Sequence, residues 1–388
     1  MKNPFLSRVA LRLRHGRPAF PSDRLTTIHH EVVGGRPFVR LWFLTEGCTH
    51  DRRGHCTMCN YGIGTPVRWD AVVDAVAEDL AVLDGANGTL LLSPSGSMFD
   101  EREVPADIRR ELFALAARSS FEQVLCESRP ESLTEAVVAE TTSILPGKQF
   151  ALEMGLESSD PWVLRWCVNK GLELATLRDA LVMAARHGVP TTLNVCVGTA
   201  FLTVRESIED ALAAVRWGLG AGASDIVLFP LLVRDWTVLA HLHRQGLYEP
   251  PSLWSLVDVL GQLGPDLAPK VSIAWYRDYS EADGGAPASM AVRARPGTCP
   301  RCEDAVLGSL DAYRDSQDFA EVTALVGIHC ACRIAWLDER AEVPSDPLEQ
   351  RVGAQYAALG REVLGEAWWE RHGVRVLGEI PPRYAAVR

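Results

Sequence analysis

Hydrophobic residues recur along the chain in two spacings: short continuous runs, and longer stretches with an apolar residue at every third or fourth position. The short runs are rich in branched and aromatic residues, which is typical of strands, whereas the longer spacing is that of amphipathic helices. The six strands predicted in this way cover residues 38–44, 88–93, 122–128, 149–155, 190–198 and 225–232. The helical spacing covers residues 69–85, 176–188 and 203–222, and Thr176 and Thr203 are the predicted N-caps of the last two.

Strands and helices alternate up to about residue 265, which predicts parallel βαβ units. This order indicates an α/β fold, either a partial or full (β/α) barrel or a doubly wound sheet. After that point the alternation stops and a second group of cysteines follows. We therefore predict an N-terminal extension (1–35), a barrel domain (36–270), a C-terminal cysteine-rich extension (271–340) and one amphipathic C-terminal helix (341–388).

Composition and charge narrow the class of protein. Of the 388 residues, 47% are hydrophobic and 23% are charged, as in ordinary globular proteins. The formal net charge of -11 argues against a protein that holds long nucleic acid, and it favours a small substrate. The sequence has no run of 18 apolar residues and no secretory signal pattern, so we expect a cytoplasmic protein without a membrane partner.

Three of the ten cysteines follow the first predicted strand, at the position where α/β barrels carry their active sites. Cys48, Cys56 and Cys59 have the spacing C-x7-C-x2-C, with no fourth cysteine nearby. Three thiolates fit a [4Fe–4S] cluster that leaves one iron open to a small molecule. The alternative is a zinc ion whose coordination is completed by His50 or His55.

Five segments add to this loop and together extend over most of residues 40 to 260. They read CTMCNYG, SPSGSMFDEREVP, CESRPESL, EMGLESSDPWVLRWCVNKG and LYEPPSLWSLVDVL. Through them the chain resembles the radical S-adenosylmethionine (SAM) enzymes, in the branch of the archaeosine-synthase radical SAM subunit, with the elongator-like tRNA-modifying enzymes more distant. The commonest family spacing is C-x3-C-x2-C, from which the first gap departs.

The resemblance implies a radical SAM barrel and its cofactors. In that family the three cysteines hold a [4Fe–4S] cluster, SAM binds the open iron, and one electron cleaves SAM to a 5′-deoxyadenosyl radical that abstracts hydrogen from the substrate. The resemblance also implies SAM contacts at the strand ends. Ser95, Gly96 and Ser97 stand where the family binds the SAM amino group, and Glu153 and Glu157 stand where it binds the ribose or amine.

Five further residues are candidates for the SAM site. Glu127 and Arg129 end the third predicted strand, and an ion pair on the surface is the alternative for them. Asn194 lies in an apolar strand, where it either binds SAM or is a satisfied core amide. Met58 occupies a position at which many relatives carry an aromatic residue against adenine, and Tyr61 is the candidate replacement.

The second cysteine group combines a C-x2-C pair with a C-x-C pair. Cys299, Cys302, Cys330 and Cys332 supply four thiolates to one site if the chain between the pairs folds back. A structural zinc ion and an auxiliary [4Fe–4S] cluster both fit, and we favour the cluster because the chain already carries iron–sulfur chemistry. The isolated cysteines, predicted to pack in the core, are Cys126, Cys167 and Cys196.

These features predict a radical SAM enzyme that acts on a small or nucleoside-like metabolite and inserts sulfur from the auxiliary cluster, as a transferase in natural-product biosynthesis. Flavodoxin or ferredoxin is the expected electron donor. One alternative is archaeosine-synthase-like modification of a tRNA base, with phosphate bound by Arg8, Arg12, Arg14 and Arg17, although the net charge argues against tRNA. The other is a non-catalytic metal-binding partner subunit.

Overall fold

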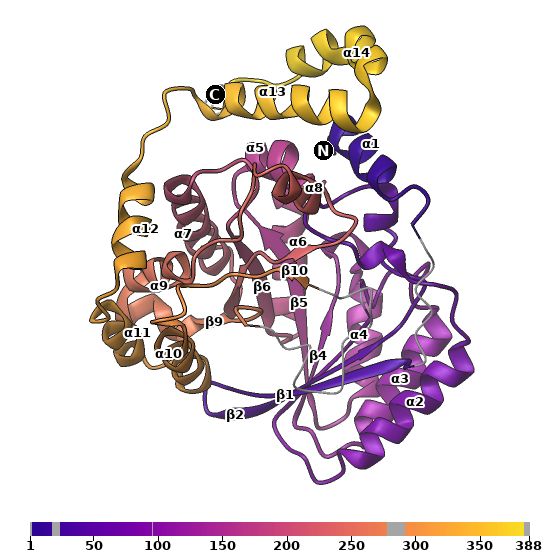
Figure 1. Ribbon diagram of the computed structural model, residues 1–388. Coiled ribbons are helices and arrows are strands. Elements are labelled where there is room, and N and C mark those ends of the chain that lie inside the picture. The colour runs from indigo at the N-terminus through magenta and orange to yellow at the C-terminus, as the bar shows by residue number, and fades with distance from the viewer. Residues whose placement is uncertain (1, 18–23, 95, 278–291, 384–388) are drawn as a thin grey trace.

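A single curved sheet dominates the structure (Figure 1). The computed structural model describes residues 2–17, 24–94, 96–277 and 292–383. The eight strands of the sheet, in spatial order, are β1 (Thr26–Val33), β2 (Arg36–Phe43), β3 (Thr89–Pro94), β4 (Gln123–Glu127), β5 (Gln149–Glu157), β6 (Thr191–Val197), β7 (Asp225–Pro230) and β9 (Val271–Ile273). A separate two-stranded ribbon pairs β8 (Val233–Arg234) with β10 (Val292–Ala294).

The strand order identifies the sheet as a partial barrel. From β2 to β9 all neighbours are parallel and follow one another in chain order, while β1 is antiparallel to β2. A doubly wound sheet would instead reverse its strand order at a switch point. Among the described residues no pairing joins β1 to β9, so the barrel stays open. The predicted (β/α) barrel is confirmed in its partial form.

Helices cover the outer face of this sheet (Figure 1). Those between successive parallel strands are α2 (Trp69–Val82), α3 (Ala106–Arg118), α4 (Glu135–Ile144), α6 (Leu174–Arg186), α7 (Val204–Gly220) and α9 (Leu253–Leu267). Shorter helical turns occupy the loops: η1 (Asp51–Arg53), η2 (Tyr61–Ile63), η3 (Pro130–Ser132), α5 (Pro161–Val163), η4 (Leu164–Val168), α8 (Val238–Arg244) and η5 (Ala268–Lys270).

One of the two predicted helix caps is confirmed. Thr203 accepts a hydrogen bond from the Glu206 amide while the Glu206 carboxylate accepts one from the Thr203 amide, which is a capping box. The prediction for Thr176 is wrong. Helix α6 begins earlier, at Leu174, with Glu173 in the N-cap position, because the apolar face of the helix continues through Leu174 and Leu177.

Alternation along the strands separates the core from the interior of the barrel. In β2, Leu41 and Phe43 pack with the outer helices, whereas Arg40 and Trp42 point to the opposite face. Successive side chains of a strand lie on opposite faces of a sheet, so the sequence places apolar residues outward and polar ones inward. The inner face is therefore available for a ligand.

The sheet extends beyond both predicted limits of the barrel domain. Strand β1 lies in the predicted N-terminal extension and pairs along its whole length with β2, from Thr26 opposite Phe43 to Val33 opposite Arg36. Strand β9 follows residue 270 and pairs with β7. Helix α1 (Pro4–Leu13) precedes the sheet, and its first turn is capped by the Asn3 side chain.

From Glu303 to Gly378 the regular elements of the chain are helices. They are α10 (Glu303–Ser316), α11 (Phe319–Val326), α12 (Ala331–Ala341), α13 (Leu348–Leu359), η7 (Gly360–Leu364) and α14 (Glu366–Gly378). The single predicted C-terminal helix is thus wrong: α13 and α14 are joined by the π-helical turn η7 and by Gly365, whose φ is 96°. The chain folds back because Gly360 leaves room for the Trp369 ring, which would lie 2.1 Å from a Cβ placed there.

Helix α13 packs against α1 at one end of the molecule (Figure 1). The Tyr356 hydroxyl accepts a hydrogen bond from Asn3 at 2.8 Å and donates one to the carbonyl of Trp166 at 2.6 Å. In the part of the chain that the structure describes, no single helix meets the length and hydropathy required to cross a membrane; α11 and α12 meet them only as a pair bent by 97°.

Candidate active site

A pocket opens at the carboxyl ends of the parallel strands. Its volume between the surrounding atoms, including the open mouth, is about 1260 Å³. Apart from the three cysteines of the β2–α2 loop, the predicted site residues that line it are Met58, Tyr61, Gly96, Glu127, Arg129, Glu153, Glu157 and Asn194. Ser97 is buried beside the pocket without lining it, and Ser95 lies outside the described residues. Predicted residues as distant in the sequence as Cys48 and Asn194 thus meet in one cavity.

The three cysteines are held by backbone contacts that fix the shape of their loop. The amide of Cys48 donates to the carbonyl of Tyr61 at 2.9 Å, and that of Cys56 donates to Asn169 at 3.2 Å. Gly47 has a φ of 97°, and a Cβ at this position would lie 2.4 Å from the Tyr61 carbonyl oxygen. Only glycine allows this close return of the chain, which brings Cys48 and Cys59 to the same cavity.

Arg14, at the carboxyl end of helix α1, contacts the cysteine loop. The buried Arg14 guanidinium donates to the backbone and carboxylate of Asp51, and to the carbonyl of Cys59 at 2.9 Å. The other Asp51 oxygen accepts from the Gly62 amide at 2.6 Å. Burial raises the pKa of Asp51 to about 6, against the opposing effect of Arg14. Arg17 also donates into the loop, to Gly62 at 3.1 Å, so these arginines brace the cysteine loop.

Burial makes the three thiols poor acids. The pKa of Cys48 is raised to about 11 and that of Cys56 to about 12, and the pKa of Cys59 is raised well above its ordinary value. Thiolates here therefore require positive charge from bound metal, which an iron–sulfur cluster supplies. His50 and His55 stack at 4.2 Å, and burial lowers their pKa values to about 3 and about 4, so both rings are neutral. The Nε2 atom of His50 is bound to the carbonyl of Lys170.

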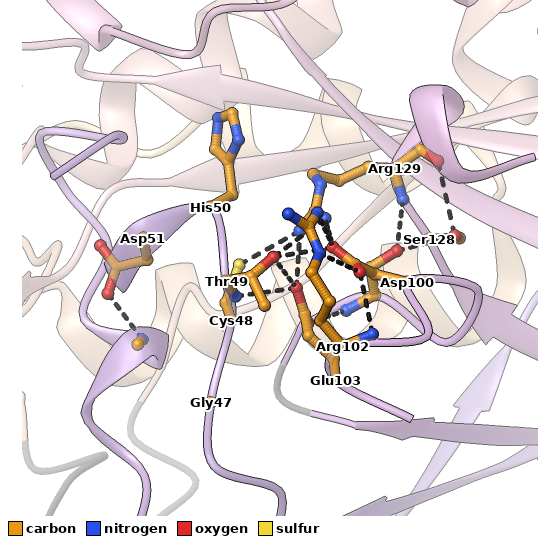
Figure 2. A network of polar contacts seen from close by, with 12 residues as sticks. Gly47, Cys48, Thr49, His50, Asp51, Asp100, Arg102, Glu103, Ser128 and Arg129 are labelled. Carbon is orange, nitrogen blue, oxygen red and sulfur yellow. Dashed lines mark hydrogen bonds and ion pairs between the residues drawn. The ribbon is translucent and has the colours of Figure 1, made fainter. Parts of the chain in front are cut away.

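A charged network adjoins Cys48 (Figure 2). Arg129 donates to the Cys48 sulfur at 3.5 Å and to Glu103 at 2.8 Å, and its second terminal nitrogen binds Asp100. Thr49 donates to Asp100 at 2.7 Å. The alternative of a surface ion pair between Glu127 and Arg129 is therefore wrong, because Arg129 pairs with two buried carboxylates of the β3–α3 loop.

Glu103 organises the segment predicted to bind the SAM amino group. Its carboxylate accepts from the amides of Ser97 at 2.7 Å and Thr49 at 2.8 Å, and a Cβ on Gly96 would lie 2.0 Å from it. Ser97 also bonds Ser128 through its hydroxyl at 2.9 Å. Ser97 thus positions the loop that carries Gly96, and glycine at 96 is required by the buried carboxylate behind it.

Two carboxylates from neighbouring strands meet inside the barrel. Burial raises the pKa of Glu127 to about 7, and nearby Glu153 adds to this effect. The pKa of Glu153 is also raised by burial, although Arg40 and a 2.9 Å hydrogen bond from Asn194 oppose it. The Asn194 Oδ1 atom is buried without a partner among the described residues. This acceptor fits a bound ligand that carries a donor, such as the ammonium or hydroxyl groups of SAM.

Glu157 lies at a distortion at the end of β5. Its φ is 66°, and its carboxylate accepts from Lys170 at 2.7 Å and from the Cys196 thiol at 2.9 Å. Gly155 is needed beside it, since a Cβ there would lie 2.4 Å from the Glu157 oxygen. Cys126 and Cys167 are core residues as predicted, but Cys196 also lines the pocket. Glu157 is thus already paired with the Lys170 cation.

Aromatic residues close the side of the pocket towards β9. The rings of Trp42 and Trp275 lie 5.5 Å apart, and the guanidinium of Arg234 lies 5.1 Å from the centre of Tyr61 and 5.7 Å from that of Trp275. Met58 lines the pocket close to the last two cysteines. Tyr61, the candidate replacement for an aromatic residue at position 58, lies in the same pocket as Met58, and its ring contacts the Arg234 guanidinium.

Several pocket residues were not predicted from the sequence, above all Arg40, Trp42, Lys170, Arg234 and Trp275. Strand alternation could have found the first two, because Arg40 interrupts an apolar run at the inward-facing positions that it shares with Trp42. Lys170 and Trp275 lie outside the strands, and Arg234 belongs to the two-residue strand β8, which is too short for alternation to predict the direction of a side chain.

The second cysteine group forms a separate site. The sulfur atoms of Cys299, Cys302, Cys330 and Cys332 all lie within 4.8 Å of one another, so the two pairs meet as predicted. None of the four lines the pocket. They pack with α9 and α10 in the apolar layer outside the sheet.

Known proteins resemble this chain more clearly in sequence than in structure. The chain is 30% identical over 238 residues to archaeosine synthase subunit beta of Thermococcus kodakarensis, which covers 59% of this chain and 73% of that protein. It is 27% identical over 300 residues to archaeosine synthase subunit beta of Methanosarcina acetivorans, covering 76% of this chain and 82% of that protein. A scan against models of protein families found no match.

Solved structures resemble this one more weakly. The Elp3 protein of Methanocaldococcus infernus has a TM-score of 0.44 and 13% identity, covering 62% of this chain and 58% of that one. Methylornithine synthase has a TM-score of 0.44 and 12% identity, covering 86% of this chain and 91% of that one. The relationship to the two archaeosine synthase subunits therefore rests on sequence identity and not on these superpositions.

Proposed function

The chain belongs to the radical SAM superfamily, in the branch that includes archaeosine synthase subunit beta, and from this premise we propose that it removes a hydrogen atom from a nucleoside-like substrate. The observation that carries the proposal is the shared pocket. Three cysteines open into the same cavity as the polar strand ends and an aromatic wall. The sites for the cluster, SAM and the substrate would then lie next to one another. A short-lived radical requires this, because it must reach the substrate before it reacts elsewhere.

The residues of this chain fit the two cofactors that the superfamily uses. Cys48, Cys56 and Cys59 would hold a [4Fe–4S] cluster. Gly96, Glu153 and Asn194 would meet the SAM molecule, and the unpartnered Asn194 oxygen supports this assignment. When bound, the cluster supplies the electron that cleaves SAM to the 5′-deoxyadenosyl radical, which takes hydrogen from the substrate.

The chain's own residues set the conditions for that chemistry. Arg129 places a cation 3.5 Å from the Cys48 sulfur, where it stabilises the thiolate. Lys170 neutralises Glu157 inside the pocket. Leu91, Leu125 and Ala151 form a buried apolar cluster against Trp42, which lines the pocket, and exclusion of water on this side would protect a reactive intermediate.

The aromatic wall supports a nucleoside-like substrate. Trp42 and Trp275 offer ring faces on which a planar base would stack. Glu127, with its pKa near neutrality, exists both as a hydrogen-bond donor and as an acceptor, which suits the edge of a base. A purely aliphatic metabolite would make no use of the ring faces.

Sulfur insertion in natural-product biosynthesis is a narrower version of this proposal. It requires a sulfide-containing cluster at the second cysteine group, from which sulfur would pass to the carbon that has lost hydrogen. Those four cysteines do not line the pocket, so the proposal would need a donor closer to the substrate. Hydrogen abstraction without sulfur transfer is the version that the pocket supports better.

Modification of a tRNA base is the second candidate, favoured by the names of both relatives. The predicted phosphate-binding arginines give it little support. Arg14 and Arg17 bind the cysteine loop, and the guanidinium of Arg8 lies 5.7 Å from the centre of a Trp368 ring. A nucleoside rather than an intact tRNA therefore fits this chain better.

The test is cleavage of SAM by anaerobically reconstituted protein with a chemical reductant, and then with flavodoxin or ferredoxin. We expect 5′-deoxyadenosine from the wild type, none above background from a Cys48/Cys56/Cys59→Ala variant, and normal formation from the control Cys126→Ala. Faster formation with a nucleoside mixture than with tRNA would support the substrate class. If no nucleoside stimulates cleavage and tRNA does, the second candidate replaces it. Absence of any cleavage would leave the non-catalytic partner subunit as the better description.

A further inference from the structure

We propose that Cys299, Cys302, Cys330 and Cys332 bind one zinc ion in a closed tetrahedral site, and that this site holds no iron–sulfur cluster. This reverses the preference drawn from the sequence, where both metals fitted the spacing. The inference concerns a site away from the pocket and is independent of the proposed function.

The distances between the sulfur atoms carry the proposal. Cys299 lies 3.7 Å from Cys302 and 3.3 Å from Cys330, and Cys302 lies 3.4 Å from Cys332, sulfur to sulfur. A tetrahedron with zinc–sulfur bonds of about 2.3 Å has sulfur–sulfur edges of about 3.8 Å. The four sulfurs therefore surround a space of the size that a single ion fills.

An iron–sulfur cube does not match these distances. Each of its thiolates binds a different iron, and the irons are themselves separated by bridging sulfide, so the cysteine sulfurs must lie further apart than around one ion. Here all four lie within 4.8 Å of one another. A disulfide is also excluded as the explanation, because its bond is about 2.05 Å long and these cysteines are free.

Local backbone structure presents the four sulfurs together. The amides of Cys302 and Glu303 both donate to the carbonyl of Cys299, at 3.0 and 3.1 Å, which makes the tight turn of a C-x2-C pair. Cys302 precedes α10 and Cys330 precedes α12, each in the N-cap position. The amino ends of two helices thus point to the site, and their partial positive charge stabilises bound thiolates.

Neighbouring side chains complete the surroundings. The indole nitrogen of Trp254 donates to the Cys332 sulfur at 3.4 Å. The Arg333 guanidinium lies 5.2 Å from the centre of a Trp254 ring and donates to the carbonyl of Ile328 at 3.0 Å. The Trp254 donor therefore offsets part of the negative charge of the four thiolates, and Arg333 holds the Trp254 ring beside them.

The position of the site gives it a structural role. Cys302 is buried in the apolar cluster that contains α9, and α12 is tied to the same helix by the bond from Trp336 to the Ser255 hydroxyl at 3.0 Å. A zinc ion with four protein ligands has no open position for a substrate. It would hold α10 and α12 against α9, and it contains no sulfide to donate.

Metal analysis of the Cys48/Cys56/Cys59→Ala variant tests the proposal, because that variant retains only the second group. After iron and sulfide reconstitution we expect about one zinc per chain and iron near background. About four irons with about four sulfides and no zinc would overturn the proposal. Cys126→Ser, added to this variant as a matched control, should leave its zinc content unchanged, whereas Cys332→Ser should lower it.

A measurement on wild-type protein covers the case in which Cys332→Ser does not fold. A thiol-reactive mercurial should release about one zinc per chain, detected with a metallochromic dye. Cobalt grown into the site should give the visible absorption bands of a tetrahedral thiolate complex. Release of no zinc, or octahedral cobalt bands, would contradict the proposal. Neither result depends on SAM cleavage, so failure here and failure of the proposed function are distinguishable.

Discussion

Glu127 shows how burial sets the charge of a single pocket residue. Its pKa is raised to about 7 by desolvation and by Glu153, whereas an unfolded glutamate titrates near 4.5. The folded protein therefore binds more protons than the unfolded chain between these values, and its stability falls as pH rises from about 4.5 to 7. The carboxylate is tolerated at neutral pH at a cost in folding free energy.

Replacing Glu127 by Gln should remove this pH-dependent cost. We expect the free energy of unfolding of Glu127→Gln relative to wild type to improve by about 1–3 kcal/mol between pH 5 and pH 8, since one pKa unit corresponds to about 1.4 kcal/mol. Urea unfolding of both proteins at each pH measures the difference. Glu101→Gln, the same substitution at an exposed position, is measured in parallel as the matched control. If the difference in free energy of unfolding between Glu127→Gln and wild type is the same at pH 5 and pH 8, the pKa of Glu127 is not raised.

Arg129 tests the buried network beside Cys48. Removing its side chain leaves the buried Glu103 without its cation, which costs about 3–5 kcal/mol in comparable buried pairs, while Asp100 keeps its pair with Arg102. We expect Arg129→Ala to lower the melting temperature by several degrees and to shift the electron paramagnetic resonance signal of the reduced cluster. Arg110→Ala, which removes an exposed partner of Glu140, should change neither measurement. An unaltered signal in a stable Arg129→Ala protein would exclude contact with the cluster.

At the scale of elements, helix α1 acts as a brace for the cysteine loop. Arg14 is the contact that reaches both Asp51 and the carbonyl of Cys59. We expect Arg14→Ala to retain the fold but to lose iron to a chelator several times faster than wild type, because buried Asp51 then lacks its cation. Arg12→Ala, on the exposed side of the same helix, is the matched control. Equal rates of iron loss would show that the loop keeps its shape without α1.

The elements also show what the sequence can and cannot predict. Strand ends and the three-cysteine loop were predictable because alternation and spacing are local properties, and parallel strands bring their carboxyl ends together. The pairing of Arg129 with Asp100 and Glu103 was not, because it joins two loops at the ends of β3 and β4. The C-terminal fold was missed for a similar reason: it depends on Trp369 filling the space beside Gly360.

The metal bound by the second cysteine group was also not predictable from the sequence. Spacing along the chain predicts that four thiols meet, but it carries no information on the distance between their sulfur atoms. That distance distinguishes one ion from a cube, and it depends on how α10 and α12 are packed against α9. The sequence favoured a cluster because the first cysteine group already predicts iron–sulfur chemistry, whereas the sulfur–sulfur distances support the zinc ion that we propose.

At the scale of the whole molecule, the net charge of -11 opposes a long polyanion. Two of the N-terminal arginines are used inside the protein, where Arg14 and Arg17 bind the cysteine loop instead of offsetting this charge locally. We therefore expect filter binding at about 50 mM salt to detect no complex with tRNA at micromolar protein, and no salt-dependent slope. Submicromolar binding that weakens steeply with salt would mean that phosphate contacts exist elsewhere on the surface. A nucleoside, which carries no phosphate, escapes this repulsion, so equilibrium dialysis with nucleosides should be insensitive to salt if the pocket is the binding site.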